Sequence, residues 1–574
     1  MDKQASSRKS RKQAQKRRNM LFLIAGAGAV IALALVLILM PKGDVPKDLV
    51  NAATTMPEDP MISPTVQPTP APITDPNLGH QELGEIVSNA SIQNAKLKLQ
   101  QQSFQGKKSV KIYQREDPIQ MGPGETYTDI EGVLTFRGNN YRDNAAYGLI
   151  PDDASKLNIK WSVSVGHLDE WAGVGWTGQA SIVRWPEETR AIMNIKDNKK
   201  QTQGLTEVII GALDGKIRFI DLEDGQPTRN MIDIKAPIKG SVSVDPRGYP
   251  MLYCGQGLFE VGGKKVQCGT RVFSLIDGKV LFYLTGDQKR KLREWYCFDA
   301  APLIDGATDT MMQLGENGLI SVITLNTDYD PSAGTISLSP QVDQLGYKSA
   351  VTTRAGMENS IAVYNHYGYF ADNSGLLCCF DLNTLKIVWA TPTGDDTDAT
   401  CAIEETDQGV FLYTANEVDL RGKTGDIQMR CYNALTGEAL WKREVYVNSN
   451  TNGGAYGSPA IGKGGIGQLV YFNIARTSEG GTLFALDKTT GKVVWKFGLG
   501  HYSWSTPLIL YDSKGKGYIL IGDSGGQLRL MDGLNGDVIT SLDLKQNIEA
   551  SPSAFENMAI VSTRGGKIFG IEIN

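Results

Sequence analysis

The feature that most constrains this chain of 574 residues is a short unit that recurs in its second half. The unit appears at residues 377–389 (LCCFDLNTLKIVW), 430–441 (RCYNALTGEALW) and 484–495 (FALDKTTGKVVW). Each copy reads as a strand with alternating apolar residues, a turn with Asp or Asn, and a second strand that ends in Trp. The turn glycine supplies a positive φ, and the Trp offers a large face to a neighbouring unit. Weaker copies lie at 219–225, 272–282 and 530–536.

A second marker, a short strand that opens with small residues, precedes each hairpin. It occurs eight times, at intervals of 41 to 62 residues: GQASIV at 178, GSVSV at 240, AAPLI at 300, NSIAV at 359, TCAI at 400, GSPAI at 457, STPLI at 505 and ASPSA at 550. Each interval accommodates four strands, and four-stranded repeats of this period are typical of β-propeller blades. The pattern predicts an all-β protein with one eight-bladed propeller of four-stranded blades over residues 131–574.

The two ends of the repeat region are complementary. The last copy stops at 567–574 (KIFGIEIN) without a final strand, whereas residues 159–165, which include Trp161, form a strand without a preceding partner. We expect residues 159–165 to pair antiparallel with 567–573 and to complete the eighth blade, because this pairing leaves no open sheet edge.

These motifs resemble those of a known group. Residues 485–495 (ALDKTTGKVVW) match the tryptophan-docking motif A-x-D-x-x-T-G-x-x-x-W of the quinoprotein alcohol dehydrogenase-like superfamily, and residues 136–142 (FRGNNYR) resemble the FRG-N-x-x-R element that often precedes such propellers. The resemblance covers about residues 130–574 and implies a PQQ-like propeller. Some members of the superfamily are dehydrogenases that hold pyrroloquinoline quinone and calcium in a central funnel. Others, such as the outer-membrane assembly lipoprotein of the β-barrel machinery, have the propeller without a cofactor, and this type is the one that the chain resembles most.

The N-terminal region has a different character. Residues 1–18 carry eight basic side chains and one acidic side chain, although the whole chain has a net charge of −5. Residues 20–40 follow without a charge or a proline, within a segment at 19–40 that is long enough to span a bilayer as a helix. The positive-inside rule then leaves the basic tail in the cytoplasm and the propeller outside a bacterial cell membrane. There are two alternatives, a basic arm that binds nucleic acid and a cleaved secretory signal. The first is disfavoured because the basic segment lies directly beside the apolar run, as the positive-inside rule expects. The second is disfavoured because the apolar run is longer than that of a secretory signal.

Residues 41–76 hold nine of the 24 prolines and are predicted to form a disordered, extended stalk. Residues 77–130 form a lead-in segment, for which we expect a short helix or a cover over the propeller.

Ligands of propellers bind at a mouth of the axial channel, near the loops that enter the innermost strands. The residues before the eight markers are therefore candidates for ligand binding, together with an aromatic residue and a histidine from two nearby loops: Trp171, Trp176, Lys239, Asp299, Glu358, Asp398, Tyr456, His501, Trp504 and Glu549. Simple plugging of the channel by these side chains is the alternative interpretation.

The histidines, the cysteines and the acidic run at 395–398 do not predict a metal site or a catalytic site. The four histidines have no metal-binding spacing, and the seven cysteines match no zinc site. Cys254 and Cys268 are a possible disulfide, or two buried thiols. The quinone-binding relatives have a vicinal disulfide, but Cys378 and Cys379 lie in a predicted strand, where neighbouring side chains point to opposite faces. Residues 395–398 (DDTD) are interpreted as a solvated loop between blades, and no metal ligand and no catalytic residue is predicted.

Two classes of function follow. The preferred one is a membrane-anchored, extracytoplasmic scaffold without enzymatic activity, which binds a protein partner or a small polar ligand, needs no cofactor and does not bind nucleic acid. The alternative is a quinoprotein dehydrogenase that depends on pyrroloquinoline quinone and calcium.

Overall fold

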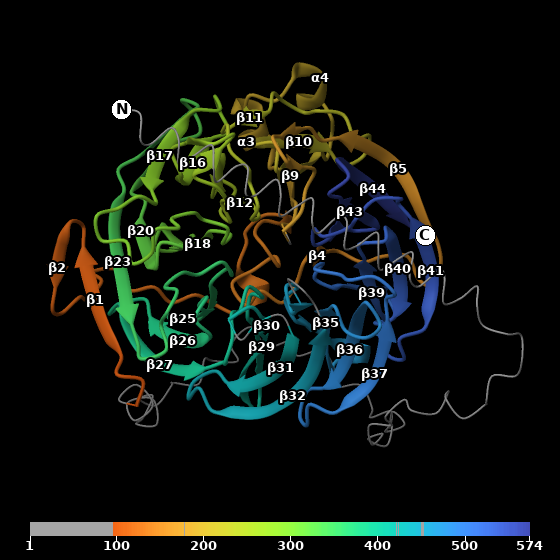
Figure 1. Cartoon of the computed structure of the whole chain (residues 1–574). Helices are drawn as coiled ribbons and strands as arrows, with labels where there is room; N and C mark the ends of the chain where they lie inside the picture. The colour runs from red at the N-terminus through yellow and green to blue at the C-terminus, as the bar shows by residue number, and fades with distance from the viewer. Residues whose placement is uncertain (1–95, 177, 421, 423, 449–452) are drawn as a thin grey trace, which may run out of the picture. The chain divides into compact units, whose positions relative to one another are not determined.

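Eight β-sheets surround a central axis and form a closed ring (Figure 1). This computed structural model describes residues 96–574, apart from 177, 421, 423 and 449–452. The expected basic tail, membrane anchor and stalk lie outside the described residues. Within the described residues, no helix is both long enough and apolar enough to cross a membrane.

Every blade contains four antiparallel strands, and the chain runs from the innermost strand to the outermost strand. The strands of the first four blades are β8 (Ser181–Arg184), β9 (Thr206–Gly211), β10 (Lys216–Asp221) and β11 (Ile232–Asp233) in blade 1; β12 (Ser243–Val244), β13 (Met251–Cys254), β16 (Gly269–Ser274) and β17 (Val280–Thr285) in blade 2; β18 (Leu303–Asp305), β19 (Thr310–Leu314), β20 (Leu319–Thr324) and β23 (Gln341–Lys348) in blade 3; and β24 (Ala362–Tyr364), β25 (Tyr367–Ala371), β26 (Leu376–Asp381) and β27 (Lys386–Pro392) in blade 4. Those of the other four are β28 (Ala402–Thr406), β29 (Gly409–Ala415), β31 (Thr424–Asn433) and β32 (Ala439–Asn448) in blade 5; β34 (Ala460–Ile461), β35 (Leu469–Ala475), β36 (Gly481–Asp487) and β37 (Val493–Gly498) in blade 6; β38 (Leu508–Tyr511), β39 (Gly517–Gly522), β40 (Gln527–Asp532) and β41 (Val538–Asp543) in blade 7; and β42 (Ser553–Phe555), β43 (Met558–Ser562), β44 (Lys567–Ile573) and β5 (Leu157–Ser164) in blade 8.

Short elements decorate the ring. They are β1 (Gln100–Gln105), β2 (Lys108–Val110), β3 (Gly132–Val133), β4 (Ala146–Tyr147), β6 (His167–Leu168), β7 (Trp171–Ala172), β14 (Glu260–Val261), β15 (Lys264–Lys265), β21 (Thr327–Asp330), β22 (Thr335–Leu338), β30 (Glu417–Val418), β33 (Gly453–Gly454), the helices α3 (Glu187–Ile192) and α4 (Asp197–Lys200), and the 3-10 turns η2 (Gly124–Thr126) and η3 (Gly464–Ile466).

The hydrophobic core consists of layers between neighbouring blades. Both faces of the second strands are covered, so β9, β35 and β39 are buried along their whole length, whereas the outer strand β41 is largely accessible. Eight clusters of buried apolar side chains occupy the eight junctions in the described ring, one for each pair of neighbouring blades. This division explains why an eight-fold sequence repeat builds one continuous core.

A tryptophan on the outer strand fastens several blades to the next. The Nε1 of Trp161, Trp389, Trp441 and Trp495 donates a hydrogen bond to a backbone carbonyl in the turn of the following blade, at 2.8, 3.0, 2.7 and 3.2 Å. The turn glycine faces the indole ring: a Cβ on Gly491 would lie 2.6 Å from the ring of Trp441. The predicted packing of the Trp against the neighbouring unit is therefore confirmed.

The ring closes where the chain's last strand meets an early one. β44 pairs antiparallel with β5, with Lys567 opposite Ser164 and Ile571 opposite Ile159. These are the two segments for which the sequence predicted pairing, and together they make the eighth blade. The all-β, eight-bladed fold is thus as predicted.

The described part of the lead-in segment, residues 96–130, contains a hairpin and the 3-10 turn η2, while most of the residues expected to form the short helix lie outside the described residues. β1 pairs with β2 and with β23, the outer strand of blade 3, and extends that sheet outward. Further along, Arg115 reaches into blade 3, where its Nη2 donates to Thr310 Oγ1 at 2.5 Å. The segment therefore covers the side of the ring.

Residues 134–145, the floor segment, lie at the ring's centre, where Figure 1 draws them in orange. Arg142 is fully buried and donates to the carbonyls of Phe136 and Ile361, both at 2.7 Å. Arg137 donates to the carbonyl of Pro507 at 3.1 Å. Both arginines have a positive φ, a costly backbone conformation that the surrounding contacts must stabilise. The floor segment thus ties blades on opposite sides of the axis together.

Candidate functional site

The residues before the eight markers occupy equivalent positions at one end of the channel, because a belt of hydrogen bonds aligns the innermost strands. In five consecutive steps around the axis, a backbone N–H of one blade donates to the hydroxyl of a Ser or Thr in the next. The acceptors are Ser360, Thr400, Ser458, Thr506 and Ser551, at 2.9 to 3.2 Å. Gln179 donates to Ser241 in the same way at 2.8 Å, and at blade 3 the equivalent residue is Ala301, which has no hydroxyl.

Six of the ten candidate residues line one small cavity on the axis, and the other four do not. The lining residues include Trp176, Asp299, Glu358, Asp398, Tyr456 and Trp504, with Phe136 of the floor segment on one side. The volume open to the centre of a water molecule is about 30 Å³, so the cavity admits an ion or at least one water molecule.

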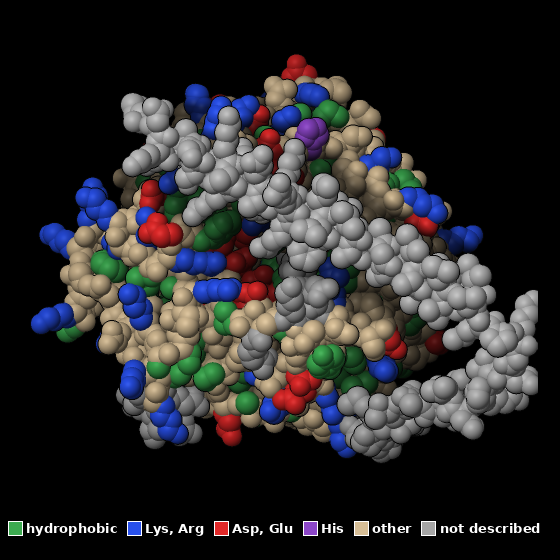
Figure 2. All heavy atoms as spheres, in the orientation of Figure 1, with side chains coloured by type: hydrophobic (Ala, Val, Ile, Leu, Met, Phe, Trp, Pro, Cys, Tyr) green, Lys and Arg blue, Asp and Glu red, His purple; other side chains and the backbone are tan. Residues whose placement is uncertain are grey.

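The mouth has two chemically different halves. Asp299, Glu358 and Asp398 precede blades 3, 4 and 5 and form an acidic half, whereas Tyr456, Trp504 and Trp176 precede blades 6, 7 and 1 and form an aromatic half. The ring of Trp504 lies 5.0 Å from that of Tyr456 and 5.9 Å from that of Trp176. Figure 2 shows acidic side chains deep in the hollow at the centre of the ring.

Lys239 joins the two halves. Its ammonium Nζ lies 4.5 Å from the centre of the Trp176 ring, 5.5 Å from that of Trp171 and 3.3 Å from Asp299 Oδ2. Burial lowers the pKa of this ammonium, but the charges of Asp299, Glu316 and Glu358 outweigh burial and raise it. Lys239 therefore stays charged inside the mouth.

Two further candidates, Glu549 and His501, do not line the cavity. Glu549 Oε2 is 3.4 Å from Arg564 Nε, and its Oε1 accepts hydrogen bonds from Asn547 at 2.7 Å and Tyr502 at 3.3 Å. His501 is exposed and packs against Gly525. These two residues are thus not brought into the group around the cavity.

Two groups of carboxylates approach one another in the acidic half. Asp299, Glu316 and Glu358 form the first, Asp396, Asp398 and Glu417 the second, and in each group the oxygens lie within 4.8 Å of one another. Burial is the main reason why the pKa values of Asp299, Glu316, Asp396, Asp398 and Glu417 lie above their ordinary range, and the charge of Glu358 adds to the rise. Each group has the oxygen donors that hard divalent cations prefer.

Three of these carboxylates, Glu316, Glu417 and Asp396, were not among the site residues predicted from the sequence. Glu316 comes from the turn between β19 and β20, and Glu417 from β30, so neither stands at a fixed distance from a marker. Asp396 was placed in a solvated loop at 395–398, and this prediction is wrong: Asp395 and Asp396 are 0% and 6% exposed. The loop turns inward because Asp395 Oδ1 accepts hydrogen bonds from the backbone of Asp396 and Leu420, at 2.9 and 2.7 Å.

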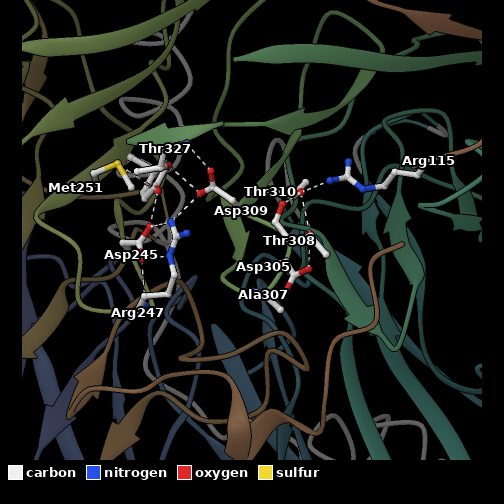
Figure 3. Close-up of polar contacts among 11 residues, drawn as sticks. Arg115, Asp245, Arg247, Met251, Asp305, Ala307, Thr308, Asp309, Thr310 and Thr327 are labelled. Carbon is white, nitrogen blue, oxygen red and sulfur yellow. Dashed lines mark hydrogen bonds and ion pairs between the residues drawn. The ribbon is translucent and has the colours of Figure 1, made fainter. Parts of the chain in front are cut away.

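A second polar network, between blades 2 and 3, has a structural character (Figure 3). Arg247 Nη2 contacts Asp245 at 2.7 Å and Asp309 at 2.8 Å, and Asp305 accepts from Thr308 at 2.6 Å. Since Arg247 of blade 2 pairs with Asp309 of blade 3, the network holds the two blades together.

The vicinal cysteines, the possible counterpart of the disulfide in quinone-binding relatives, lie away from the axial cavity. Cys378 and Cys379 do not line it; they are free thiols in β26, buried in two different apolar clusters. The possible disulfide between Cys254 and Cys268 is absent as well, and Cys268 Sγ instead lies 3.4 Å from Cys297 Sγ.

The eight four-stranded blades and the docked tryptophans define the fold class of this protein: it is an eight-bladed β-propeller with PQQ-like repeats. The family model described as "Outer membrane protein assembly factor BamB" matches residues 334–499 and 479–574. No curated protein matches the chain.

Several solved structures are similar to this chain. A europium-containing methanol dehydrogenase shares 13% identity, with 68% of this chain and 89% of that chain covered and a TM-score of 0.42. A quinohemoprotein alcohol dehydrogenase from Pseudomonas putida HK5 shares 12% identity over 77% of this chain and 80% of that chain, with a TM-score of 0.41. BamB from Moraxella catarrhalis shares 13% identity over 73% of this chain and 100% of that chain, with a TM-score of 0.33. Likeness at these levels is weak, and it carries no information about activity.

Proposed function

We propose that this chain is a membrane-anchored binding protein of the bacterial cell envelope, which contacts a protein partner or a small polar ligand at the mouth of the propeller and catalyses no reaction. The basic residues 1–18 and the apolar residues 20–40 support an orientation with a cytoplasmic N-terminus and an extracytoplasmic propeller. Weak similarity to both BamB and dehydrogenases is compatible with a scaffold but does not select a partner.

The observation that carries the proposal is the unpaired indole N–H of Trp504. Its side chain borders the cavity, yet its buried Nε1 has no hydrogen-bond acceptor among the described residues. A buried N–H without an acceptor is costly, and an oxygen atom of a ligand removes that cost. The neighbouring rings of Trp176 and Tyr456 supply apolar contact around this donor, as in many binding pockets.

Site-specific crosslinking in cells tests this proposal. A photo-reactive amino acid replaces Tyr456 in the full chain, and a second variant carries it at Tyr446, which is 57% exposed on the outer strand of blade 5. We expect a discrete adduct from position 456 only, and its loss when Trp504→Ala is added. Equal labelling from both positions, or none from 456, would contradict binding at the mouth.

The dehydrogenase alternative has its own test. The full chain is incubated with pyrroloquinoline quinone and calcium, and then separated from free quinone. We expect no bound quinone absorbance and no dye reduction, because Cys378 and Cys379 are buried as free thiols and form no disulfide at the cavity. A bound quinone would replace the scaffold proposal.

A further inference from the structure

A groove lies on the side of the ring, between blade 3 and the β1–β2 hairpin. Its lining comes mainly from β1, β2 and the end of β23, together with the loop after β17 that holds Arg290. The volume open to the centre of a water molecule is about 690 Å³. Ligand sites in proteins usually measure about 300–1,000 Å³. The groove shares no lining residue with the axial cavity and is therefore a separate candidate site.

All the charged side chains that line this groove are cationic. They are Arg290, Lys111, Lys348 and Lys386, and no Asp or Glu among the described residues joins them. The three lysines are exposed, and none of them forms an ion pair within the described part of the chain. Residues 96–111 add four more lysines and hold no acidic residue, although the whole chain has a net charge of −5. Figure 2 shows Lys and Arg side chains around this hairpin, so the positive charge there is not balanced.

Protection of an exposed sheet edge does not account for these charges. Lysines on an edge strand discourage pairing with other chains, and Lys111 directly follows the edge strand β2. Lys348, however, belongs to β23, whose outer side already pairs with β1, and Arg290 lies in a loop. The Nη1 of Arg290 donates to the carbonyl of Gly106 at 2.9 Å, so the hairpin turn holds this guanidinium beside the groove. The cations are thus arranged around the groove and not only along an edge.

The groove offers hydrogen-bond donors but little aromatic surface. The side-chain amides of Gln100 and Gln102 are in its lining. The guanidinium Cζ of Arg290 lies 4.7 Å from the centre of the Phe104 ring and covers one face of it. Tyr347 is only 4% exposed. Proteins that bind single-stranded nucleic acids stack the bases on aromatic rings, so this lining suits an anionic polymer without bases.

We propose that this groove binds a linear phosphodiester polymer without bases, of the poly(glycerol phosphate) type. A lysine ammonium is a point charge that binds phosphate in many orientations, whereas the planar fork of an arginine matches a carboxylate. Three of the four cations in the lining are lysines, so a polymer of phosphates fits better than a polymer of carboxylates. The amides of Gln100 and Gln102 donate to phosphate oxygens. This proposal does not rest on binding at the mouth.

Titration of the full chain in detergent with a fluorescent glycerol phosphate oligomer tests this site. Fluorescence anisotropy is measured at about 50 and 200 mM salt. A polyglutamate and a thymidine oligonucleotide of equal charge serve as competitors. We expect saturable binding that weakens with salt, because counterions of the phosphates are released, and weaker binding of both competitors. Absence of saturable binding at the lower salt concentration would overturn the proposal, and so would a competitor that binds equally well or better.

Variants distinguish the groove from the basic residues 1–18, which every variant keeps. Lys111→Gln combined with Lys348→Gln is expected to weaken binding roughly tenfold or more at low salt. It should also make the slope of log affinity against log salt shallower by about 1 to 2. The matched control, Lys492→Gln combined with Lys496→Gln, removes two exposed lysines of blade 6 and is expected to bind like the natural protein.

Equal binding by the groove variant and the natural protein would overturn the proposal. An equal loss in both double variants would overturn it as well, because net charge or the basic tail would then be the cause. All four lysines are exposed, so we expect both double variants to keep the thermal midpoint of the natural protein.

Discussion

The indole Nε1 of Trp441 donates a 2.7 Å hydrogen bond to the carbonyl of Lys488, which lies in the turn of the next blade. The same ring packs against Gly491 in that turn and belongs to the apolar layer between blades 5 and 6. One side chain thus contributes a hydrogen bond and a large apolar contact to the junction between blades 5 and 6.

Replacement of this tryptophan by phenylalanine is expected to weaken the junction. Trp441→Phe loses the hydrogen bond to Lys488 and leaves a small gap, which costs about 1–3 kcal/mol of the free energy of unfolding. Urea denaturation followed by circular dichroism measures the change. Lys442→Ala, on the exposed side of the same strand, serves as the control and is expected to have almost no effect. Equal loss in both variants would contradict a specific docking role.

The turn glycine is the second half of this contact. Gly491 has a φ of +66°, and an added Cβ would lie 2.6 Å from the Trp441 ring, so Gly491→Ala adds a clash to backbone strain. Gly500 has a φ of +79° with no atom within 4 Å, so Gly500→Ala adds strain alone. We expect a loss of about 1 kcal/mol for Gly500→Ala and about 2–4 kcal/mol for Gly491→Ala. Similar losses in thermal or urea unfolding would show that packing against Trp441 is unimportant.

The fold was predictable because its main signals are local. The Asp-x-x-Thr-Gly turn and the alternating strands on either side are short-range patterns, and Trp161 without a preceding partner showed where the ring closes. Asp299, Glu358 and Asp398 were also predictable, since each stands directly before a marker and the ring brings equivalent positions together.

The rest of the site depends on contacts that have no regular spacing in the sequence. Glu316 and Glu417 enter the acidic half from a turn and a short strand outside the repeat. The role of Ser458 and its equivalents was missed for another reason: the small residues of the markers were used only to locate the repeat. Their hydroxyls in fact accept hydrogen bonds from the neighbouring blade.

The hydroxyl belt yields a test of its own. Ser458→Ala leaves the backbone N–H of Thr400 without its acceptor at 3.2 Å, and this group is buried beside the axis. We expect a loss of about 1–3 kcal/mol in urea unfolding. Ser458→Thr keeps the hydroxyl and is expected to retain more stability than the alanine variant. An alanine variant as stable as the natural protein would show that the belt is not required.

Cys268 and Cys297 are expected to form a disulfide when the protein folds in an oxidising compartment. Their Sγ atoms are 3.4 Å apart and both side chains are buried, so a small rotation brings them to bonding distance. The two thiols lose two protons and two electrons to a disulfide oxidant, which is reduced to two thiols. Alkylation after non-reducing unfolding should label two fewer cysteines in envelope-derived protein than in protein made in a reducing cytoplasm. Equal labelling would contradict either the pairing or the extracytoplasmic location.

A buried ion pair in blade 1 should make the free energy of unfolding depend on pH in the acidic range. Asp214 Oδ1 lies 3.0 Å from Arg218 Nη1, and the Asp214 side chain is 2% exposed. Burial raises the pKa of the Asp214 carboxyl, but the hydrogen bonds and charge of Arg218, with backbone N–H donors, outweigh burial and hold it below its ordinary value. The pair therefore stabilises the fold above the ordinary carboxyl pKa near 4, and this contribution is lost as the pH falls through the lower pKa of the folded state.

The variant Asp214→Asn removes the charge and leaves Arg218 buried without its partner. We expect it to lose about 3 kcal/mol of the free energy of unfolding at pH 7, and to approach the natural protein as the pH falls below about 4. Urea unfolding at a series of pH values measures both curves. Asp328→Asn, at an exposed carboxylate of β21, is the control and should run parallel to the natural protein at every pH. A constant difference between Asp214→Asn and the natural protein from pH 7 to pH 3 would mean that the charge of Asp214 is not the source of its contribution.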